Sequence, residues 1–552
     1  MKIHFNYIIN LKDYKEEITI VARPWFKHVV KGNPTEIEIP EISLPQMLKK
    51  TVAQFKDNIA ISFYDKTFTY GQFYHIVQRV ASAFNKLGVK KGDRVALMLP
   101  NCPQYPISYY AALQCGAIVV QVNPMYRANE LVHTLNDSGT KLIIAYDKVI
   151  PVIEAIKDKT PLETVLSVSF EDPTCSFNSL LQDVGDQIPQ VDLNPKEDVA
   201  ILQYTGGTTG RSKGAMLTHY NVVANTMQSA ATSHVNLTFG AERILTIVPL
   251  FHVLGMTVGM NMAVYLGSNL ILLPKFEVEE VLEAIKRHRP SNFPGVPTMY
   301  IALLNHPKLQ EVDMTCFRTM TCGSAPLPVE VLNHFNSKSG AQISEGFGLS
   351  EASPVTHRNP CKGLQKPGSV GIPIPNTDAK IVDIATGIQE MPVNEVGELV
   401  IKGPQIMKGY WQKPEETASA IRDGWLYTGD LAMMDEDGFF FIVGRKKELI
   451  IASGFNVYPV EVEEVLYTYP KVLEAAVIGV PHPYRGETVK AYIVLKDGEE
   501  ATAEEIIAFC KKHLATFKVP ELIEFRQEMP KSTVGKILKK VLKEQLEENQ
   551  IS

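Results

Sequence analysis

A run of glycine and hydroxyl residues that ends in a lysine is the part of the sequence best suited to holding a phosphate chain. In the segment YTGGTTGRSKG, residues 204–214, such residues extend from Thr205 to Ser212 with only Arg211 between them. Glycines let the backbone approach a phosphate closely, and hydroxyls and amides donate hydrogen bonds to phosphate oxygens. The apolar run AILQY before the segment predicts a strand, which is where phosphate loops begin. Taken alone, the segment fits a flexible loop of chance composition equally well.

The segment is not a Walker A loop. That motif is G-x-x-x-x-G-K-[ST], in which a hydroxyl residue after the lysine holds magnesium. Here Lys213 lies three residues after Gly210 and is followed by Gly214. The sequence therefore disfavours a P-loop motor or regulatory NTPase and leaves open another way of holding ATP.

Two other segments combine glycine, hydroxyl and carboxylate residues at the ends of predicted strands. EGFGLSE, residues 345–351, does not fit the Rossmann pattern G-x-G-x-x-G, and its last glutamate can belong to a surface turn. That residue, Glu351, together with phosphate oxygens would also be ordinary magnesium ligation. CGSAPLP, residues 322–328, has the composition of a helix N-cap followed by an early proline.

Four more segments each contain a polar residue that has both a structural and a chemical interpretation. Asp430 in GWLYTGD is of a type that usually stabilises a turn, but a carboxylate is also a natural partner of a sugar diol. His252 in PLFHVLG lies among apolar residues, where a histidine is more often part of the core than a catalyst. Lys447 in GRKKEL and Lys536 in PKSTVGKILKK both fit solvated basic surfaces.

In their order along the chain, these segments resemble the motifs of the adenylate-forming superfamily, which comprises acyl-CoA synthetases, adenylation domains and firefly-type luciferases. The Thr/Ser/Gly run with Lys-Gly is similar to the family's signature loop, with Ser212 where proline is common. Phe347 and Ser350 stand where tyrosine and threonine are more usual, and both replacements keep the chemistry. The resemblance covers most of the chain.

The resemblance implies a role for each matched residue. Glu351 is expected to hold Mg²⁺, His252 to border the substrate carboxylate, and Lys536 to be the catalytic lysine. Asp430 is expected to bind the ribose, and Phe347 to stack on adenine. The other residues that the resemblance assigns to ATP or CoA are Thr205, Gly206, Gly207, Thr208, Thr209, Gly210, Lys213, Gly323, Ser324, Ala325, Pro326, Glu345, Gly346, Gly348, Ser350, Arg445, Lys447 and Gly454.

Within the superfamily, segments such as MLPNCPQYPISYYAALQCGAIVVQVNPMY look most like bacterial long-chain fatty-acid–CoA ligases. The resemblance implies two half-reactions: ATP and a medium- to long-chain fatty acid give acyl-AMP and pyrophosphate, and CoA then takes the acyl group and releases AMP. The cofactors and co-substrates implied are ATP, Mg²⁺ and CoA. An aryl-acid CoA ligase is the nearest alternative, followed by an adenylating enzyme with another acceptor or a luciferase-like oxygenase.

The large N-terminal part must provide strands that end at these motifs. Short apolar runs such as RVALML (94–99) and AIVVQV (117–122) alternate with helical segments such as 127–139, which predicts parallel βαβ units. The fold class is therefore α/β, and we expect this large domain to occupy residues 1–444.

The pattern of apolar, glycine and proline residues changes twice after these parallel units. Short alternating strands with Gly/Pro turns predict a small antiparallel β subdomain over residues 367–444. Residues 445–552 then predict a small, mobile α+β domain, with a hinge near Lys447 that matches the family's hinge position. In the family, the loop that contains Gly454 lines the pantetheine tunnel.

Composition limits the setting in which the protein works. The 552 residues carry a net charge of −6, so no basic surplus suggests a nucleic-acid partner. Seven dispersed cysteines without a C-x-x-C pair fit reduced thiols in a cytoplasm. The N-terminus does not fit a signal peptide, and the apolar stretch 254–274 reads as a buried helix and strand. Peripheral contact with the inner face of a membrane and a homodimer stay open.

The segment that follows His252 is a candidate wall for the acyl chain. Val253–Gly267 is apolar, with small glycines and three flexible methionines, and it predicts a deformable tunnel without a fixed polar group. We therefore expect a preference for fatty acids over hydroxylated aromatic acids.

Overall fold

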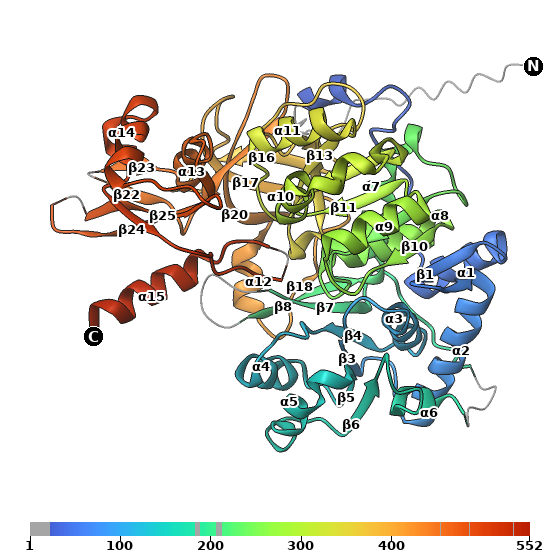
Figure 1. Cartoon of the computed structure of the whole chain (residues 1–552). Helices are drawn as coiled ribbons and strands as arrows, with labels where there is room; N and C mark the ends of the chain where they lie inside the picture. The colour runs from blue at the N-terminus through green and yellow to red at the C-terminus, as the bar shows by residue number, and fades with distance from the viewer. Residues whose placement is uncertain are drawn as a thin grey trace, which may run out of the picture.

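The computed structural model describes residues 23–182, 188–205, 212–452, 454–484, 486–533 and 535–551. Figure 1 shows a large part formed by most of the chain and a smaller C-terminal part beside it. In the described residues, the largest sheet has the strand order β15-β14-β13-β12-β11-β9-β10-β1-β2. Its strands are β1 (Ile59–Phe63), β2 (Lys66–Thr69), β9 (Arg243–Thr246), β10 (Asn269–Leu272), β11 (Asn292–Gly295), β12 (Thr319–Cys322), β13 (Ile343–Gly348), β14 (Val355–Arg358) and β15 (Ile372–Pro373).

A second sheet of the large part has the order β18-β8-β7-β4-β3-β5-β6. Its strands are β3 (Arg94–Met98), β4 (Ile118–Gln121), β5 (Leu142–Tyr146), β6 (Thr164–Val168), β7 (Val199–Thr205), β8 (Lys213–Thr218) and β18 (Gly409–Tyr410). The predicted parallel units form the centres of both sheets, but β2, β8, β14, β15 and β18 pair antiparallel at the edges. Both sheets are therefore mixed rather than purely parallel.

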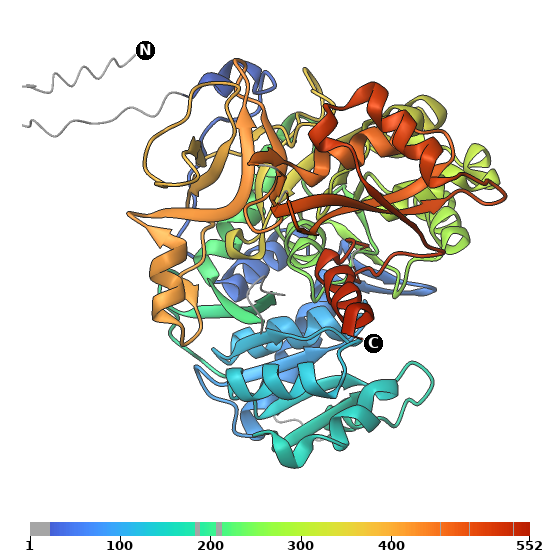
Figure 2. The ribbon, with the colours of Figure 1, turned by 90° about the vertical axis from the view of Figure 1, so that its left-hand side faces the viewer.

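Two smaller sheets follow along the chain. One contains β16 (Asp378–Val382), β17 (Gly397–Lys402), β19 (Ile421–Arg422), β20 (Trp425–Met434) and β21 (Phe440–Arg445). The other belongs to the C-terminal part and contains β22 (Ile450–Ala452), β23 (Phe455–Val457), β24 (Val472–His482), β25 (Gly486–Leu495) and β26 (Leu522–Phe525). One sheet thus ends at Arg445 and the next begins at Ile450. Figure 2 shows the C-terminal elements in red beside the orange strands of the preceding sheet.

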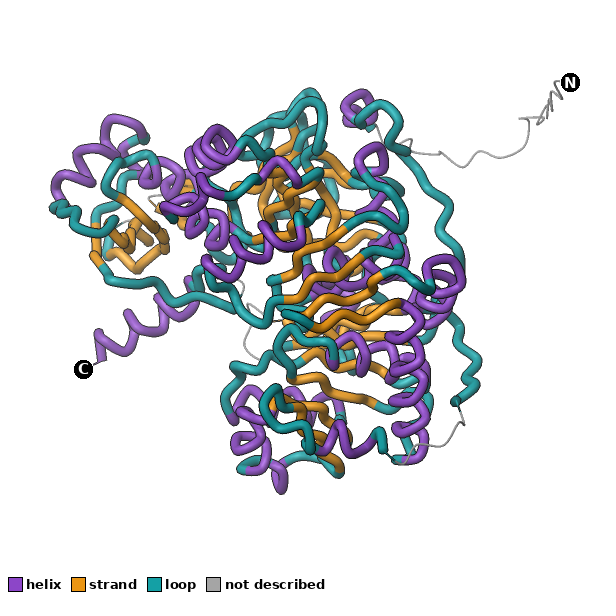
Figure 3. Tube along the Cα trace, turned by 45° about the vertical axis from the view of Figure 1, so that its right-hand side comes forward, coloured by secondary structure: helices purple, strands orange, loops and turns teal. Residues whose placement is uncertain are grey.

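Helices lie on both sides of the two large sheets (Figure 3). They are α1 (Leu44–Phe55), α2 (Tyr70–Lys86), α3 (Gln104–Gln114), α4 (Ala128–Ser138), α5 (Ile150–Glu154), α6 (Ser176–Leu180), α7 (His219–Ala231), α8 (Met262–Leu266), α9 (Val278–His288), α10 (Pro297–Asn305), α11 (Val329–Ser339), α12 (Pro414–Ala420), α13 (Pro459–Tyr467), α14 (Ala503–His513) and α15 (Lys539–Ile551). Several start where the sequence supplies a reciprocal cap. Thr69 and Gln72, for example, bond to each other's backbone amides at the start of α2.

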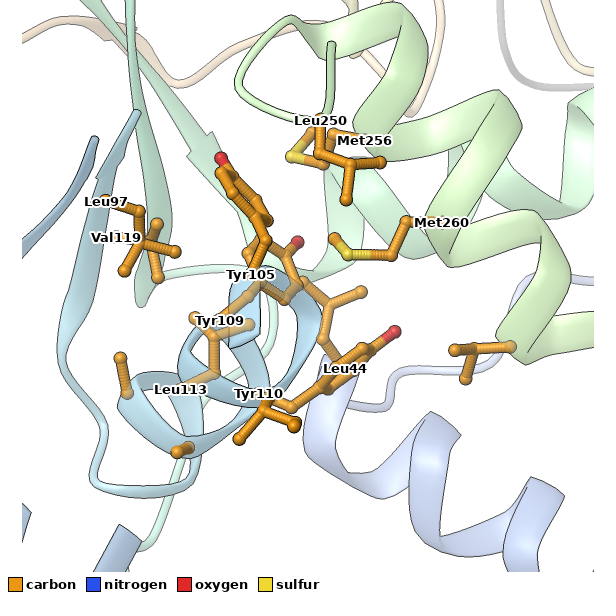
Figure 4. Packing of buried hydrophobic residues seen from close by; sticks show 14 of the residues in the cluster. Leu44, Leu97, Tyr105, Tyr109, Tyr110, Leu113, Val119, Leu250, Met256 and Met260 are labelled. Carbon is orange, nitrogen blue, oxygen red and sulfur yellow. The ribbon is translucent and has the colours of Figure 1, made fainter. Parts of the chain in front are cut away.

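The segment after His252 forms a π-helix, Gly255–Asn261, that continues into α8. Its glycines permit close packing: a Cβ at Gly255 would lie 2.3 Å from the Pro249 carbonyl oxygen, and one at Gly259 would lie 2.7 Å from Thr246 Cγ2. Met256 and Met260 point into the core formed with the tyrosines of α3 (Figure 4). The predicted buried helix is confirmed, and all three of its methionines, Met256, Met260 and Met262, belong to the core.

Candidate active site

Asp430 and Arg445 form an ion pair on neighbouring strands, in which Asp430 is buried and the Arg445 side chain is 34% exposed. β20 and β21 place the two residues opposite each other, and Arg445 Nε lies 3.0 Å from Asp430 Oδ1. Burial raises the pKa of Asp430, whereas the charge of Arg445 acts in the opposite direction. The second carboxylate oxygen, Oδ2, is buried without a hydrogen-bond partner among the described residues. An unpaired buried acceptor of this kind fits a ribose hydroxyl as its missing donor.

The backbone before Asp430 explains its orientation. The residue lies within β20, so the turn in which the sequence placed it was wrong. The β17–β20 register shifts between Glu398 and Val400, and Gly429 has φ 71° in the left-handed region. The Asp430 amide donates to Thr428 Oγ1 at 3.1 Å. Such a bulge re-aims a side chain that regular pairing would leave on the other face.

Lys536 reaches this pair from the C-terminal part. The preceding residue, Gly535, has φ 72°, and a Cβ there would lie only 2.2 Å from Thr298 Oγ1 on α10. Burial lowers the pKa of Lys536, and the neighbouring charge of Arg445 lowers it further. The ammonium group is also close enough to influence Asp430. The glycine thus lets the loop dock on the large part and carry the lysine into the site.

His252 is the fourth residue of this group, beside Lys536. The Leu254 amide donates to His252 Nδ1 at 3.3 Å, so the proton of the neutral ring is on Nε2. Burial lowers the pKa of His252 to about 4, and the charge of Lys536 contributes in the same direction. The ring is therefore neutral at pH 7 and can donate through Nε2. This agrees with a residue that borders a substrate carboxylate and does not act as an acid.

A second group contains Glu351, Tyr410 and Lys213. Glu351 lies in a short 3-10 helix, Ser350–Ala352, and its Oε1 accepts a hydrogen bond of 2.8 Å from the Tyr410 hydroxyl. Lys213 Nζ lies 4.4 Å from the centre of the Tyr410 ring. Burial and the charge of Glu351 raise the pKa of Tyr410, which keeps the hydroxyl a donor. Tyr410 was missed by sequence reasoning, because nothing in its type or spacing links it to Glu351.

The residues present fit a magnesium ion that is shared with phosphates. In the part of the chain that the structure describes, no three His, Cys, Asp or Glu side chains gather as a metal site. Mg²⁺ commonly uses one or two carboxylates together with substrate phosphates and water. The single carboxylate of Glu351, oriented by Tyr410 beside a lysine, matches that arrangement.

The segment 322–328 does not form the helix cap predicted from its composition. α11 begins at Val329, and its N-cap residue is Pro328, which makes no side-chain cap. Ser324 instead has φ 70° in the left-handed region. The carboxylate of Glu345 supports this segment, because its Oε1 accepts a hydrogen bond of 3.4 Å from the Leu327 amide. Burial raises the pKa of Glu345 to about 7.

Most of the remaining residues that the sequence assigned to ATP or CoA lie in β13 or directly after β12 and β13. Gly323 and Gly346 lie side by side at the ends of β12 and β13, since a Cβ at Gly323 would be 3.6 Å from the Gly346 carbonyl oxygen. Phe347 is the next residue of β13. Its ring makes an edge-to-face contact with the ring of His357, and the two ring centres are 6.1 Å apart. The structure also describes Gly348 and Ser350 after Phe347, and Ala325 and Pro326 after Ser324.

Three further predicted sites, namely the glycine-rich loop, Gly454 and Lys447, lie outside the described residues or on exposed turns. Gly206 to Gly210 fall outside the described residues, but the backbone of Thr205 pairs with Lys213 across β7 and β8. Gly454 lies on the exposed turn between β22 and β23, with no heavy atom within 4 Å of an added Cβ. Lys447 lies in an exposed turn after β21. The structure does not bring Gly454 to the nucleotide residues.

A cavity begins along the helix that follows His252. It is lined by Val258 and Met262 on one side and by strands β11 and β12 on the other. Polar residues also line it, and His252 is not among its lining residues, so the apolar acyl tunnel stays a prediction. The polar residues are Ser229, Ser233, Asn292, Thr319, Thr321 and Arg358.

The chain belongs to the AMP-binding enzyme family. The family model described as AMP-binding enzyme matches residues 48–411, and that of the AMP-binding enzyme C-terminal domain matches residues 461–536. The membership predicted from the motifs is confirmed.

Individual proteins are similar over nearly the whole chain. A long-chain-fatty-acid–CoA ligase of Bacillus subtilis is 46% identical and covers 96% of this chain and 99% of its own length. A feruloyl-CoA synthase of Amycolatopsis is 37% identical over 85% of this chain and 92% of its own length.

Among solved structures, MatB of Rhodopseudomonas palustris is similar in two forms. Its ATP-bound form has a TM-score of 0.85 at 32% identity and covers 91% of this chain and 99% of its own. Its apo form has a TM-score of 0.75 at 31% identity over the same shares.

Proposed function

We propose that the protein is an AMP-forming fatty-acid–CoA ligase for medium- to long-chain acids. The observation that carries this proposal is the meeting of Lys536, His252 and the Asp430–Arg445 pair, with His252 just before an apolar helix. A nucleotide and a carboxylate each have a matching part of that arrangement, and the apolar helix Gly255–Asn261 is the candidate wall for the acyl chain. The fatty-acid ligase of Bacillus subtilis supports the choice of acid.

In the first half-reaction, the carboxylate oxygen of the acid attacks the α-phosphate of ATP, and pyrophosphate leaves with the bonding electrons. Two anions must approach each other, so a cation at their meeting point lowers the barrier. Lys536 provides that cation, and the neutral His252 orients the carboxylate through Nε2. Asp430 and Arg445 fix the nucleotide so that the leaving group lies in line.

Glu351 would hold Mg²⁺ together with phosphate oxygens, and the ion would supply charge neutralisation for the departing pyrophosphate. Tyr410 keeps the carboxylate of Glu351 oriented, and Lys213 provides a second cation nearby. Glu351→Gln should raise the Mg²⁺ concentration needed for half-maximal activity. Glu345→Gln is the matched control, because Glu345 supports the loop 322–328 and lies apart from Tyr410.

In the second half-reaction, the CoA thiol attacks the acyl carbon and AMP leaves. We propose that the small domain, residues 445–552, rotates about Lys447 between the two steps, so that the loop with Gly454 replaces the loop with Lys536. Lys446 lies just before the hinge and pairs with Glu398 at 3.0 Å, which anchors that end on the large part. The higher similarity to the ATP-bound form of MatB supports assigning the observed arrangement to the first step.

The rotation can be tested at the hinge itself. Lys447→Pro fixes φ and should slow thioester formation while leaving pyrophosphate release largely intact. Lys446→Ala removes the anchor without fixing the backbone and serves as the control. Equal loss of both half-reactions in Lys447→Pro would contradict the rotation.

The acid specificity is tested by AMP release across a panel of acids with and without CoA. We expect CoA-dependent AMP release with dodecanoate to exceed that with benzoate, coumarate or ferulate. The feruloyl-CoA synthase relative and the polar groups in the cavity favour an aryl acid as the second candidate. Higher kcat/KM for an aryl acid would establish that alternative instead.

We also propose that the enzyme works in the cytoplasm on small-molecule substrates, with peripheral membrane contact and a homodimer as further outcomes to test. All seven cysteines are free, as expected for a reducing compartment. Among the described residues, no helix has both the length and the apolar character needed to cross a bilayer. Cell fractionation and sedimentation of the purified protein test these proposals.

A further inference from the structure

One face of helix α4 bonds to the strands on either side of the glycine-rich segment. His133 Nε2 donates a hydrogen bond of 2.8 Å to the Ser212 carbonyl oxygen, and Ser212 directly precedes Lys213, the first residue of β8. The ring of His133 also makes an edge contact with the ring of Tyr204 on β7, and the two ring centres are 6.5 Å apart. His133 therefore holds the backbone at the point from which the Lys213 side chain projects.

Asp137 lies one helical turn after His133 and on the same face of α4. Its Oδ2 accepts a hydrogen bond of 2.7 Å from the Tyr204 hydroxyl. Burial and this hydrogen bond raise the pKa of Tyr204, so the hydroxyl keeps its proton and remains the donor. The main-chain carbonyl of Asp137 accepts a further bond of 3.2 Å from Trp411 Nε1. Asp137 thus connects β7 with the residue that follows Tyr410.

These bonds reach the candidate metal residue through β8 and β18. The two strands pair antiparallel, and the Trp411 amide donates to the Gly214 carbonyl oxygen at 2.8 Å. Lys213 of β8 lies against the ring of Tyr410, whose hydroxyl donates to Glu351. Helix α4 therefore contacts the chain on both sides of this group, next to the lysine and next to the tyrosine.

We propose that His133 and Asp137 are positioning residues for the group of Lys213, Tyr410 and Glu351, and that they set the affinity for ATP and Mg²⁺ through it. This inference rests on the proposed function of that group. Charged groups that are already in place need no reorganisation when the ligand arrives, so a looser backbone beneath them weakens binding. The loss of either α4 side chain should therefore lower the affinity for ATP and Mg²⁺ while leaving every charge of the group in place.

The test is the KM for ATP and the Mg²⁺ concentration for half-maximal pyrophosphate release in matched variants. His133→Ala and Asp137→Ala each remove one hydrogen bond, so both values should rise about fivefold. His133→Gln restores a donor and Asp137→Asn restores an acceptor, so these variants should return towards the wild type. Asn136→Ala is the control, because it removes a bond from the same helix to the Lys159 carbonyl, away from the site.

A double-mutant cycle shows whether His133 acts through Lys213. Lys213→Met removes the cation that His133 is proposed to position, so His133→Ala should cause no further rise in the KM for ATP in that background. A further rise as large as in the wild-type background would overturn the assignment of His133. Tyr204→Phe removes the bond to Asp137 from its other partner, and it provides a reading if the α4 variants do not fold.

The outcomes are distinguishable. Rises in both alanine variants that the Gln and Asn variants reverse and Asn136→Ala does not share support the inference. Wild-type values in both alanine variants, or an equal loss in the conversion of supplied acyl-AMP and CoA to thioester, would overturn it. A wild type that binds MgATP in calorimetric titration but releases no pyrophosphate with any fatty acid would overturn the proposed function. The same titration of the variants would still test the positioning role.

Discussion

The two sides of the candidate site are positioned in different ways. On the large part, Asp430 is paired with Arg445, and Glu351 accepts a hydrogen bond from Tyr410. On the C-terminal side, the Lys536 side chain forms no hydrogen bond or ion pair with a described residue, and its loop approaches Thr298 through Gly535. The groups that we assign to the nucleotide are thus held in place beforehand, whereas the proposed catalytic cation depends on the docking of one loop.

The largest effect is expected where that docking is blocked. Gly535→Ala would place a methyl group 2.2 Å from Thr298 Oγ1, so the loop could not approach. We expect pyrophosphate release to fall by about 10²–10³-fold, the loss usually seen when one positioned stabilising group is removed. Gly498→Ala is the matched control, because Gly498 also has a positive φ but open space around it. Equal losses in the two variants would show that backbone strain, not docking, causes the effect.

The second-largest effect is expected at Asp430, on the large part, where the ion pair with Arg445 holds the side chain in place. Asp430→Asn leaves the volume unchanged but replaces one acceptor oxygen by a donor beside Arg445. We expect KM for ATP to rise by about tenfold to a hundredfold, as for a buried hydrogen bond to a charged group. Asp437→Asn alters a carboxylate in the turn between β20 and β21 that pairs with Lys366 and Lys27, and it serves as control. An unchanged KM for ATP in Asp430→Asn would remove the ribose assignment.

Acid should weaken the large part through its buried histidines. Burial lowers the pKa of His219 and His252 to about 4 and that of His357 to about 3. Between pH 6.5 and 4 the unfolded chain therefore binds protons that the folded chain does not, so stability falls as the pH falls. Each histidine contributes up to about 1.4 kcal/mol per pH unit. Glu345 acts in the opposite direction, because its raised pKa of about 7 means that its stabilisation is lost as the pH rises through 7.

Urea unfolding at pH 7, 6 and 5 measures this slope. His219→Asn keeps an acceptor for the Leu44 amide and should flatten the slope by up to about 1.4 kcal/mol per pH unit. A free energy of unfolding that stays constant from pH 7 to pH 5 would contradict the neutral state of these histidines.

The smallest effect should come from Tyr410→Phe. The variant removes the hydrogen bond to Glu351 but keeps the ring beneath Lys213. A single hydrogen bond of this kind contributes about 1 kcal/mol, so the apparent Mg²⁺ requirement should rise about fivefold. Tyr427→Phe loses a bond to the Gly387 carbonyl and provides the control. A Mg²⁺ requirement that rises equally in both variants would show that Tyr410 has no special link to the metal position.

The sequence predicted the features that local residues determine, and it did not predict those that depend on distant contacts. Elements with a continuous apolar run or a clear helical period were predicted close to their observed bounds, such as 127–139 for Ala128–Ser138. The edge strand β14 was missed, and β15 and β18, which fall within the predicted β subdomain, pair with the large sheets instead, because these strands are short and their pairing depends on distant partners. The turn assigned to Asp430 was wrong because the bulge in β20 depends on pairing with β17.

Candidate site residues with a local motif could be named from the sequence, and those without one could not. Glu351 and Lys536 stand in recognisable segments, whereas Tyr410 and Thr298 are ordinary residues that become relevant only by contact. The cap predicted at 322–328 failed because Ser324 adopts a left-handed conformation that its type does not reveal. The polar lining of the cavity, Arg358 included, comes from strands and helices far apart in the sequence.

The most direct measurement separates the two half-reactions in Lys536→Ala. The account predicts that pyrophosphate release from ATP and a fatty acid falls by about 10²–10³-fold, because one positioned cation is lost. Conversion of supplied acyl-AMP and CoA to thioester should remain close to the wild-type rate, because that step does not use the lysine. A folded Lys536→Ala protein that loses both half-reactions in the same proportion, or loses neither, would contradict the account.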